Sequence, residues 1–549
     1  MANYSLSQIG TTLNSVLSGG AGTVAALTLP SNVTLSTVAT RRPRFALLGS
    51  NAFLVNSPTR NLWIDRDRNV MPMNLQPPIV APVLTAVAGG SLSGTFQVKT
   101  TFLLRDVLTG EVVIESPFGP VSATSATLAT QYLKANGLPL SKDPVAATSS
   151  DFQIANRYRI DRRLYRTTTG PGVPFFPWID VEGNTQTAVQ DDLSDAALDN
   201  VAAPTALGNP PGTVGSSRLV LLVSWRGRLW GVDSEKLDDV VFSEEGLFSQ
   251  WASNRFTIPP KGFDARGVTG FAPRREALGV GKTNALFQVT GTSTANFRVV
   301  KLSENVGIEA PESVVIYRDV VWFLWKDGVY QWDGEGIKSI SDGKVRAWFT
   351  TDTYFNRSRF QNAFATIDPS RNKYRLHLAN AGDSSENRWV EYDYVDKIWF
   401  GPHQRDDVTP TSAFLLYDTN DVAIPCMGNS TGFLWKDQAT RTDGASTAID
   451  SDLTGKFHDM QSPDIEKYFG ELALISKIQS AGTLTITPYV GGLDANAGSA
   501  ISASMTAGRE RLRRLGTGRF VRLLMRHNTA AQDVELFGYE VGFHEVGRR

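Results

Sequence analysis

The stretch from residue 320 to residue 341 reads VVWFLWKDGVYQWDGEGIKSIS and contains three tryptophans and a tyrosine. Over Val320 to Trp325, the period-2 alternation of a strand puts large apolar side chains on both faces. After an Asp-Gly turn, Tyr330 and Trp332 share one face of a second strand. A strand that is apolar on both faces lies inside a protein, between two packed layers. The stretch therefore predicts a central strand pair whose aromatic side chains form a core rather than a ligand platform.

A polar turn followed by a short aromatic strand recurs from about residue 217 to residue 440. The instances are RGRLWGV (226–232), NALFQVTG (284–291), DGVYQWDG (327–334), NRWVEYDY (387–394) and TGFLWKD (431–437). Their turns are roughly 57, 43, 60 and 44 residues apart, and a unit of this size is typical of propeller blades. We predict a β-propeller over residues 207–440, with about five or six blades. The expected blade-core side chains are Trp225, Trp230, Phe287, Trp322, Trp325, Tyr330, Trp332, Trp389, Trp399 and Trp435.

The N-terminal segment, residues 1–78, contains RFALLGSNAFLVN (44–56), which has the same turn-and-strand pattern. We expect this segment to contribute a helix near residues 6–17 and propeller or platform strands, with a blade completed by later chain. Residues 79–206 have short strands between turn residues and predict a β-sandwich inserted into the propeller.

The C-terminal part, residues 441–549, alternates strands such as TLTITPYVGG with small-residue loops and predicts a β-rich tail-tube or platform region. Two further helices are expected, near residues 125–135 and 341–349. The expected fold class is therefore mainly β: a propeller, an inserted sandwich and a C-terminal β-rich domain.

Composition limits the class of protein. The net charge is −1, from 54 basic and 55 acidic side chains, which argues against a strongly basic nucleic-acid binder. Cys426 is the single cysteine, so no intrachain disulfide can form and a reducing folding compartment fits. The sequence shows neither a signal-peptide pattern nor an apolar run long enough to span a bilayer. We expect synthesis in a cytoplasm and no membrane anchor.

Catalytic and metal-binding patterns are weak. Gly281-Lys282-Thr283 lacks the upstream glycine of a phosphate-binding loop, since Glu276 stands there. Residues 428–432 fit G-x-S-x-G, but the residues that follow predict a strand where a nucleophile elbow needs a helix. The five histidines, His377, His403, His458, His527 and His544, are dispersed.

Carboxylates are plentiful, but no complete sialidase-type aspartate box is present. The acidic run Asp191, Asp192, Asp195 and Asp199 lacks a calcium-loop pattern and predicts a solvated loop. We therefore expect no enzyme activity, no catalytic residue, no metal site and no cofactor.

Basic residues gather in RERLRRLGTGRFVRLLMR (509–526), where one strand face carries alternate arginines. The ordinary interpretation is a solvated or subunit-contacting face, and the sharper one is contact with DNA phosphates. Arg41, Arg42 and Arg44 leave the same two interpretations open. The DNA-contact candidates are Arg274, Arg275, Arg519 and Arg522.

The segment ENVGIEAPESVVIYRDVVWFLWKDGVYQWDGEGIKSISDGKVRAWF (304–349) carries a family resemblance. Together with NALFQVTG before it and NRWVEYDYVDKIWF after it, it resembles the tail nozzle proteins of short-tailed phages, often named tail tubular protein B. Residues 79–206 resemble, less closely, the fibronectin type III-like modules of phage structural proteins, through GTFQVKTTFLLRD and RRLYRTT.

The resemblance implies a virion structural protein, made in the host cytoplasm and located in the phage tail. In that family six copies form a ring below an adaptor, and the ring is a conduit that retains and then ejects the phage genome without sequence specificity. The expected partners are further copies of this chain in a hexameric ring, tail adaptor and tail-tube proteins, and the passing DNA.

Three other interpretations remain open on the residues alone. One is a carbohydrate-binding or adhesion propeller on a phage or cell surface, and another is a head-closure or tail-hub relative. The third is a propeller hydrolase.

Overall fold

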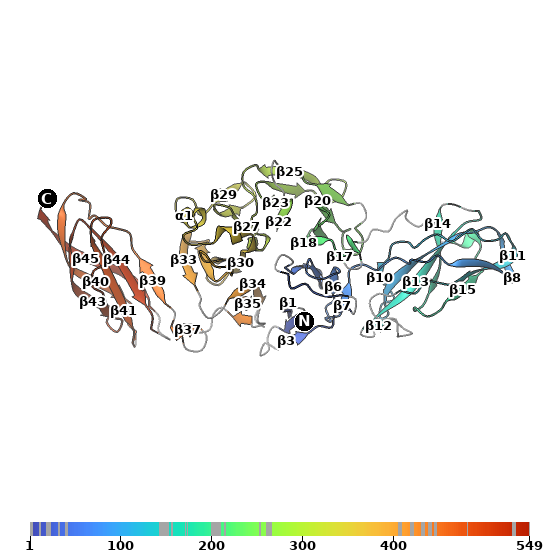
Figure 1. Cartoon of the computed structure of the whole chain (residues 1–549), viewed down its shortest axis with the longest axis horizontal. Coiled ribbons are helices and arrows are strands. Elements are labelled where there is room, and N and C mark those ends of the chain that lie inside the picture. The colour runs from blue at the N-terminus through green and yellow to red at the C-terminus, as the bar shows by residue number, and fades with distance from the viewer. Residues whose placement is uncertain are drawn as a thin grey trace. The chain divides into compact units, whose positions relative to one another are not determined.

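The computed structural model describes a chain built almost entirely of strands (Figure 1). The described residues are 4–9, 12–17, 24–30, 33–38, 42–141, 153–154, 157–170, 172, 174–198, 210–213, 216–251, 254–259, 266–404, 409–417, 422–429, 434–436, 442–443, 447–448, 450–479, 481–529 and 534–547. They fall into two compact units, one of the described residues up to Trp435 and one of those from Lys436 onward. The prediction of a mainly β, multi-domain chain is confirmed.

Five four-stranded antiparallel sheets make up most of the first unit, each from four strands consecutive in the sequence. They are β4 (Arg44–Leu48), β5 (Asn51–Val55), β6 (Leu62–Ile64) and β7 (Val70–Pro72); β18 (Leu219–Trp225), β19 (Arg228–Asp233), β20 (Lys236–Phe242) and β21 (Arg255–Thr257); β22 (Val268–Pro273), β23 (Leu278–Lys282), β24 (Leu286–Thr290) and β25 (Arg298–Ser303); β26 (Val315–Tyr317), β27 (Val320–Trp325), β28 (Gly328–Trp332) and β29 (Ile337–Ser339); and β30 (Phe364–Asp368), β31 (Lys373–Leu378), β32 (Arg388–Asp393) and β33 (Ile398–Gln404). Two three-stranded sheets flank this series: β1 (Tyr4–Ile9), β2 (Thr12–Leu17) and β3 (Val24–Ala26); and β34 (Pro410–Tyr417), β35 (Ala423–Asn429) and β36 (Leu434–Lys436).

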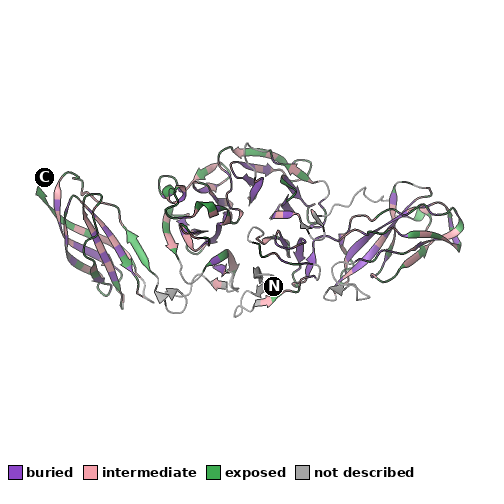
Figure 2. Cartoon of the chain, viewed as in Figure 1, coloured by how far each residue is buried: buried purple, intermediate pink, exposed green. Residues whose placement is uncertain are grey.

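The first strand of each sheet contacts the first strand of the next, along the series β4, β18, β22, β26, β30 and β34. Figure 1 shows these sheets following one another along an arc. Neighbouring sheets also share hydrophobic cores, and Figure 2 shows the buried residues concentrated in their strands. Such side-by-side packing of small sheets is what blades require. A closed propeller stays a prediction.

The recurring aromatic motif does not mark one fixed strand position. RGRLWGV lies on the second strand of its sheet, β19, whereas the later instances lie on third strands. The irregular spacing therefore has two causes: this change of strand, and an extra segment ahead of β30. That segment contains α1 (Arg346–Thr350) and the 3₁₀ turn η3 (Arg357–Asn362).

The expectation that an N-terminal blade is completed by later chain is wrong. The sheet β4-β5-β6-β7 is complete within residues 44–72, and its strands pair only with one another among the described residues. Short turns allow each strand to pair with its immediate neighbour in sequence, so no distant strand is needed.

Two of the three helix predictions are also wrong. Residues 6–17 form the hairpin of β1 and β2, and residues 125–135 lie largely in β11 (Leu128–Asn136). In both segments the apolar residues mimic a helical spacing, but Ser and Thr favour other conformations and strand partners supply the backbone hydrogen bonds. Residues 341–349 do contain helix, since α1 begins at Arg346.

The insert is a pair of packed sheets. One sheet contains β10 (Val112–Glu115), β9 (Val98–Asp106), β13 (Tyr158–Thr167), β12 (Gln153–Ile154) and β14 (Phe175–Val181), and the other contains β15 (Ala188–Asp191), β11 and β8 (Val83–Gly94). Leu133, Leu164 and Trp178 are buried between them. The insert also docks on its neighbours: Tyr158 of β13 packs edge-on against Trp63 of β6, with ring centroids 5.4 Å apart.

The second unit is another pair of sheets. β39 (Ser451–Thr454), β44 (Phe520–His527), β41 (Thr483–Gly491) and β42 (Ile501–Ser504) form one, and β43 (Arg509–Gly518), β40 (Glu466–Ser476) and β45 (Leu536–Gly547) form the other. Their shared core includes Phe469, Leu472 and Ile486. Two short hairpins and two 3₁₀ turns complete the description: β16 (Gly212–Thr213) with β17 (Ser216–Ser217), β37 (Thr442–Asp443) with β38 (Thr447–Ala448), η1 (Asp195–Ala197) and η2 (Pro311–Ser313).

Candidate functional site

The predicted blade-core aromatics lie within and between neighbouring sheets. Trp225, Trp230, Phe287, Trp322, Tyr330 and Trp332 are buried, while Trp325, Trp389, Trp399 and Trp435 are half-buried. Trp230 stacks on Phe242 with ring centroids 4.4 Å apart and meets Phe297, just ahead of β25, edge-on at 5.2 Å. These side chains are therefore packed against protein rather than displayed to solvent.

Two tryptophans at strand ends hold the sheet β22–β25 from both sides. The indole Nε1 of Trp225, at the end of β18, donates a hydrogen bond of 2.6 Å to the carbonyl oxygen of Arg274. The Nε1 of Trp325, at the end of β27, donates one of 2.7 Å to the carbonyl oxygen of Thr283. Each indole thus satisfies its donor on a neighbouring sheet, a use of tryptophan that the sequence pattern did not reveal.

Two of the four DNA-contact candidates, Arg274 and Arg275, belong to the first unit and have different surroundings. Arg274 lies between two sheets: its Nη2 is 2.6 Å from Asp319 Oδ2, and its guanidinium lies over the Trp332 ring at 5.0 Å. Arg275 has an 86 % exposed side chain. Arg274 therefore holds a contact between sheets, whereas Arg275 remains an accessible cation.

The other two candidates belong to the second unit. Arg522 is held between aromatic rings, 4.6 Å from the Phe457 centroid and 4.3 Å from that of Tyr489, while Arg519 is exposed. Arg509, at the start of β43, forms an ion pair with Glu540 at 2.6 Å. The contact with two rings gives the half-buried Arg522 a packing role.

A charged cluster joins the first strand β4 to sheets that are distant from it in the series. Arg42, just ahead of β4, donates a 2.8 Å hydrogen bond to the carbonyl oxygen of Asn362, just ahead of β30. It also lies 3.6 Å from Glu386, which Arg359 contacts at 2.8 Å. Arg44 pairs with Glu312, and burial lowers the pKa of Arg44 to about 10.

These contacts join residues at the start of β4 to η2, to η3 and to the connection between β31 and β32. Of the three N-terminal arginines weighed as DNA contacts, Arg42 and Arg44 are half-buried and take part in ion pairs, and Arg41 lies outside the described residues. No signal in the sequence identified Glu386 or Glu312 as their partners, because the pairs join residues hundreds of positions apart.

We expect Glu386→Gln to lower the free energy of unfolding of the first unit by about 1.5–3 kcal/mol, because it weakens a charge-assisted hydrogen bond from Arg359 and an ion pair with Arg42, both partly buried. Urea unfolding followed by tryptophan fluorescence measures this. The exposed Glu276→Gln serves as a control, since Glu276 makes only surface pairs and should change stability by less than about 0.5 kcal/mol. Equal effects of the two substitutions would contradict the buried role of Glu386.

The insert carries an ionic network on the sheet face turned away from its core. Arg105 contacts Asp161 and Asp180, each at 2.8 Å, and Arg163 contacts Asp180 at 2.7 Å. Glu115 lies 3.6 Å from Arg163 and extends the network. The alternation RIDRRLYR on β13 creates one row of this network, but the partners come from β9, β10 and β14 and could be found only in the fold.

The acidic run after β15 is not simply a solvated loop, which corrects that prediction. Asp195 accepts hydrogen bonds of 2.9 Å from the fully buried Arg166 and 2.8 Å from the Thr169 amide. Asp191 accepts one of 3.1 Å from the Trp178 indole. Asp195 thus gives the buried guanidinium of Arg166 a charged partner, which lowers the cost of its burial. Asp199 lies outside the described residues.

The insert should lose stability in acid. Burial alone would raise the pKa of Asp161, but hydrogen bonds from Arg159, the Gly183 amide and Arg105 hold it below its ordinary value. Burial would likewise raise the pKa of Asp195, but hydrogen bonds from Thr169 and Arg166 hold it below its ordinary value. A lowered pKa contributes stability above the unfolded value, about 3.9, that is lost as pH falls through the folded value.

We therefore expect the urea unfolding midpoint of the full chain to be flat above about pH 5 and to fall below about pH 4. Urea unfolding at each pH, followed by far-ultraviolet circular dichroism, checks this. The Asp161→Asn variant should start lower and fall less steeply, and an unchanged slope would contradict the assignment.

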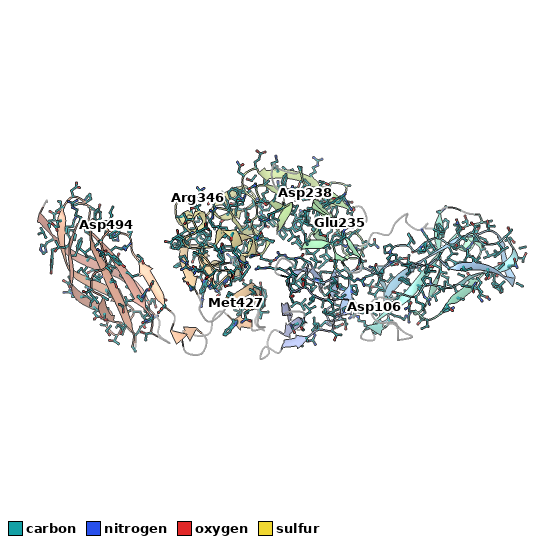
Figure 3. The ribbon with its side chains drawn as sticks, viewed as in Figure 1. Asp106, Glu235, Asp238, Arg346, Met427 and Asp494 are labelled. Atoms are coloured by element: carbon teal, nitrogen blue, oxygen red, sulfur yellow. The ribbon has the colours of Figure 1, made fainter. Side chains whose placement is uncertain are left out.

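The phosphate-loop-like and G-x-S-x-G motifs correspond to no catalytic site among the described residues. Lys282 lies in β23 as a fully buried residue, and its Nζ is 2.7 Å from Asp238 Oδ1, a residue labelled in Figure 3. Its amine thus pairs with a neighbouring sheet and does not face a phosphate cradle. In the G-x-S-x-G pattern Ser430 lies outside the described residues, and strand β36, not a helix, follows it.

The histidines lie in different elements: His377 on β31, His403 on β33, His458 ahead of β40, His527 on β44 and His544 on β45. Among the described residues no group of three His, Cys, Asp or Glu side chains is placed to hold a metal ion. A small pocket of about 170 Å³ in the second unit has the apolar lining Met460, Val521, Leu523 and Val541 with His458 and Tyr539. In the part of the chain described here, no helix has the length and apolar character to cross a membrane.

Comparison with known proteins identifies no family. No family model and no curated protein matches the chain. Solved structures with local similarity include an extracellular domain of the putative hybrid two-component system BT4673 from B. thetaiotaomicron, at 10% identity and TM-score 0.29, covering 100% of this chain and 73% of that chain. Others are PorZ of Porphyromonas gingivalis, at 10% identity, TM-score 0.26 and coverage of 99% and 75%, and Kluyveromyces lactis Hsv2, at 6% identity, TM-score 0.27 and coverage of 51% and 71%. At these TM-scores the similarities carry no argument about function.

Proposed function

We propose that this chain is a structural subunit of a bacteriophage tail, a nozzle or tail-tube protein that acts through assembly and not through catalysis. Copies of the chain form a hexameric ring on a tail adaptor, and the ring encloses the path of the phage DNA. The sheets of the first unit form the blades of a propeller in this assembly.

The observation that carries the proposal is the use of the aromatic repeat. Its indoles are buried or hydrogen-bonded between sheets, as Trp225 and Trp325 are on the two sides of β22–β25. A carbohydrate platform needs aromatic faces open to solvent, whereas a building block needs rigid joints between repeated sheets. The segment 304–349, which carries the nozzle resemblance, contributes residues to two hydrophobic cores that it shares with neighbouring sheets.

The cluster of Arg42, Arg44 and their carboxylates supports the same proposal. Because these arginines are paired within the chain, they do not offer a free basic surface that would grip DNA. A conduit has to let DNA pass quickly, and weak phosphate contacts favour passage.

Electron microscopy of phage particles tests the proposal. The virions carry an affinity tag on this chain, and a tag-directed gold label should decorate the tail tip as a ring density. Label on the capsid or label absent from particles would contradict the proposal. Binding of the purified chain to a glycan array, abolished by replacing an exposed aromatic such as Phe400, would instead favour adhesion.

A further inference from the structure

The second unit has a long strand edge without a partner. Among the described strands, β45 pairs only with β40, and β43 on the opposite side of the same sheet also pairs only with β40 (Figure 1). Open edges present unpaired backbone groups and are templates for pairing with another chain.

The edge strand β45 lacks the lysines and prolines that often block such pairing, and its charged residues are the glutamates Glu540 and Glu545. Over Leu536–Gly547 it contains no Lys, Arg or Pro. It also exposes apolar side chains, with Phe537 66%, Phe543 41% and Val546 58% accessible. Residues of its second half are exposed as a run, and Figure 2 shows the same. β45 therefore has the properties of a docking edge.

The two edges have complementary charge. β43 begins RERLRR, with exposed Arg509 and Arg511, while β45 carries exposed Glu540 and Glu545. Pairing β45 with β45 would set glutamates against glutamates, and pairing β43 with β43 would set arginines against arginines. Only β45 against β43 brings opposite charges together.

The register within the sheet indicates how the charges would meet. Ala473 of β40 lies opposite Arg511 on one side and opposite Glu540 on the other, so both belong to one row across the sheet. A further β43 placed beside β45 in this row sets its Arg511 next to Glu540. The sheet then continues from copy to copy with its faces preserved.

We propose that β45 of one copy pairs with β43 of the next copy, so that the sheet β43-β40-β45 runs head to tail through a homo-oligomer. Such a heterologous contact generates a ring when the rotation closes. This inference names the contact between copies in the ring proposed above and to that extent rests on it.

Exchanging charges at this contact between β45 and β43, called the seam below, tests the proposal in the full chain. Sedimentation velocity over a concentration series measures self-association of the wild type, of Glu540→Lys and of Arg511→Glu. We expect the wild type to self-associate. Each single variant should have a dissociation constant on the order of tenfold higher than the wild type, or a larger increase, because like charges meet at the seam. An equimolar mixture of the two variants should regain wild-type association, since each seam then joins opposite charges.

Two matched controls carry the same charge changes elsewhere in the unit: Asp494→Lys, at a residue labelled in Figure 3, and Lys456→Glu, both at exposed positions. They should associate as the wild type does. Hydrogen exchange adds a local readout, since amides of β45 should gain protection on association. Glu540→Lys also removes the pair between Arg509 and Glu540 within one copy. Mixing the variants cannot repair that internal pair, so regained association in the mixture would show that the charges act at the seam.

A wild type that stays monomeric up to its solubility limit would overturn the proposal. So would variants that associate normally, or folded variants whose mixture fails to associate. The gold-labelling experiment on virions measures where the chain is located and does not depend on the seam. It can therefore support the tail function even if the seam is disproved. A seam confirmed in a chain absent from tails would leave the head-to-tail sheet standing and remove the tail function.

Discussion

Replacing Trp230 with alanine is expected to lower the free energy of unfolding of the first unit by about 3–5 kcal/mol. The side chain is fully buried, stacks on Phe242 and donates a 3.1 Å hydrogen bond to the carbonyl oxygen of Trp225. Its removal leaves a cavity where two sheets meet, and the packed rings around it cannot collapse to fill the space. Urea unfolding followed by far-ultraviolet circular dichroism measures the change.

A matched variant separates the core role of the aromatic repeat from a ligand role. Trp389→Ala removes a half-buried indole and should lower stability by only about 1 kcal/mol. If Trp230→Ala left stability intact but removed binding of a sugar or another small ligand, the packing interpretation would be wrong.

Asp238→Ala is expected to have an effect of similar size, about 3–5 kcal/mol, because it leaves the ammonium group of the buried Lys282 without its charged partner. The pair joins β20 to β23, so its loss also weakens the contact between two neighbouring sheets. Thermal unfolding by calorimetry gives the change in stability.

The reverse replacement gives the control. Lys282→Met keeps the length and apolar stem of the side chain and leaves Asp238, which is 37% exposed, with access to water. This variant should change stability by less than about 1.5 kcal/mol. Equal losses in both variants would show that the Coulombic attraction itself, and not the unpaired buried charge, dominates.

Local sequence signals predicted the strand content well. The alternation around Trp322 and Trp332 placed both residues in central strands, because burial on two faces requires apolar side chains at every position. Helix predictions at residues 6–17 and 125–135 failed, since an apolar spacing of three or four residues also occurs in short strands. Strand pairing, which the spacing does not report, decided those segments.

The charged groups were predicted less well. Arg42, Arg44 and Arg274 were weighed as surface cations, yet each is paired with residues of another sheet. An isolated arginine in a sequence shows its charge but not its partner. The same holds for Asp195, whose role depends on the buried Arg166.

The sequence by itself determined that this chain is built of short strands with aromatic cores, because side-chain alternation and turn residues act over a few neighbouring positions. The tertiary structure alone decided which strands complete each sheet, which carboxylates pair with Arg42, Arg44 and Arg166, and which edges stay open. These features depend on contacts between residues far apart in the chain, and no local pattern contains them. The aromatic stretch 320–341 belongs to the first class, and the open edge of β45 beside the arginines of β43 belongs to the second.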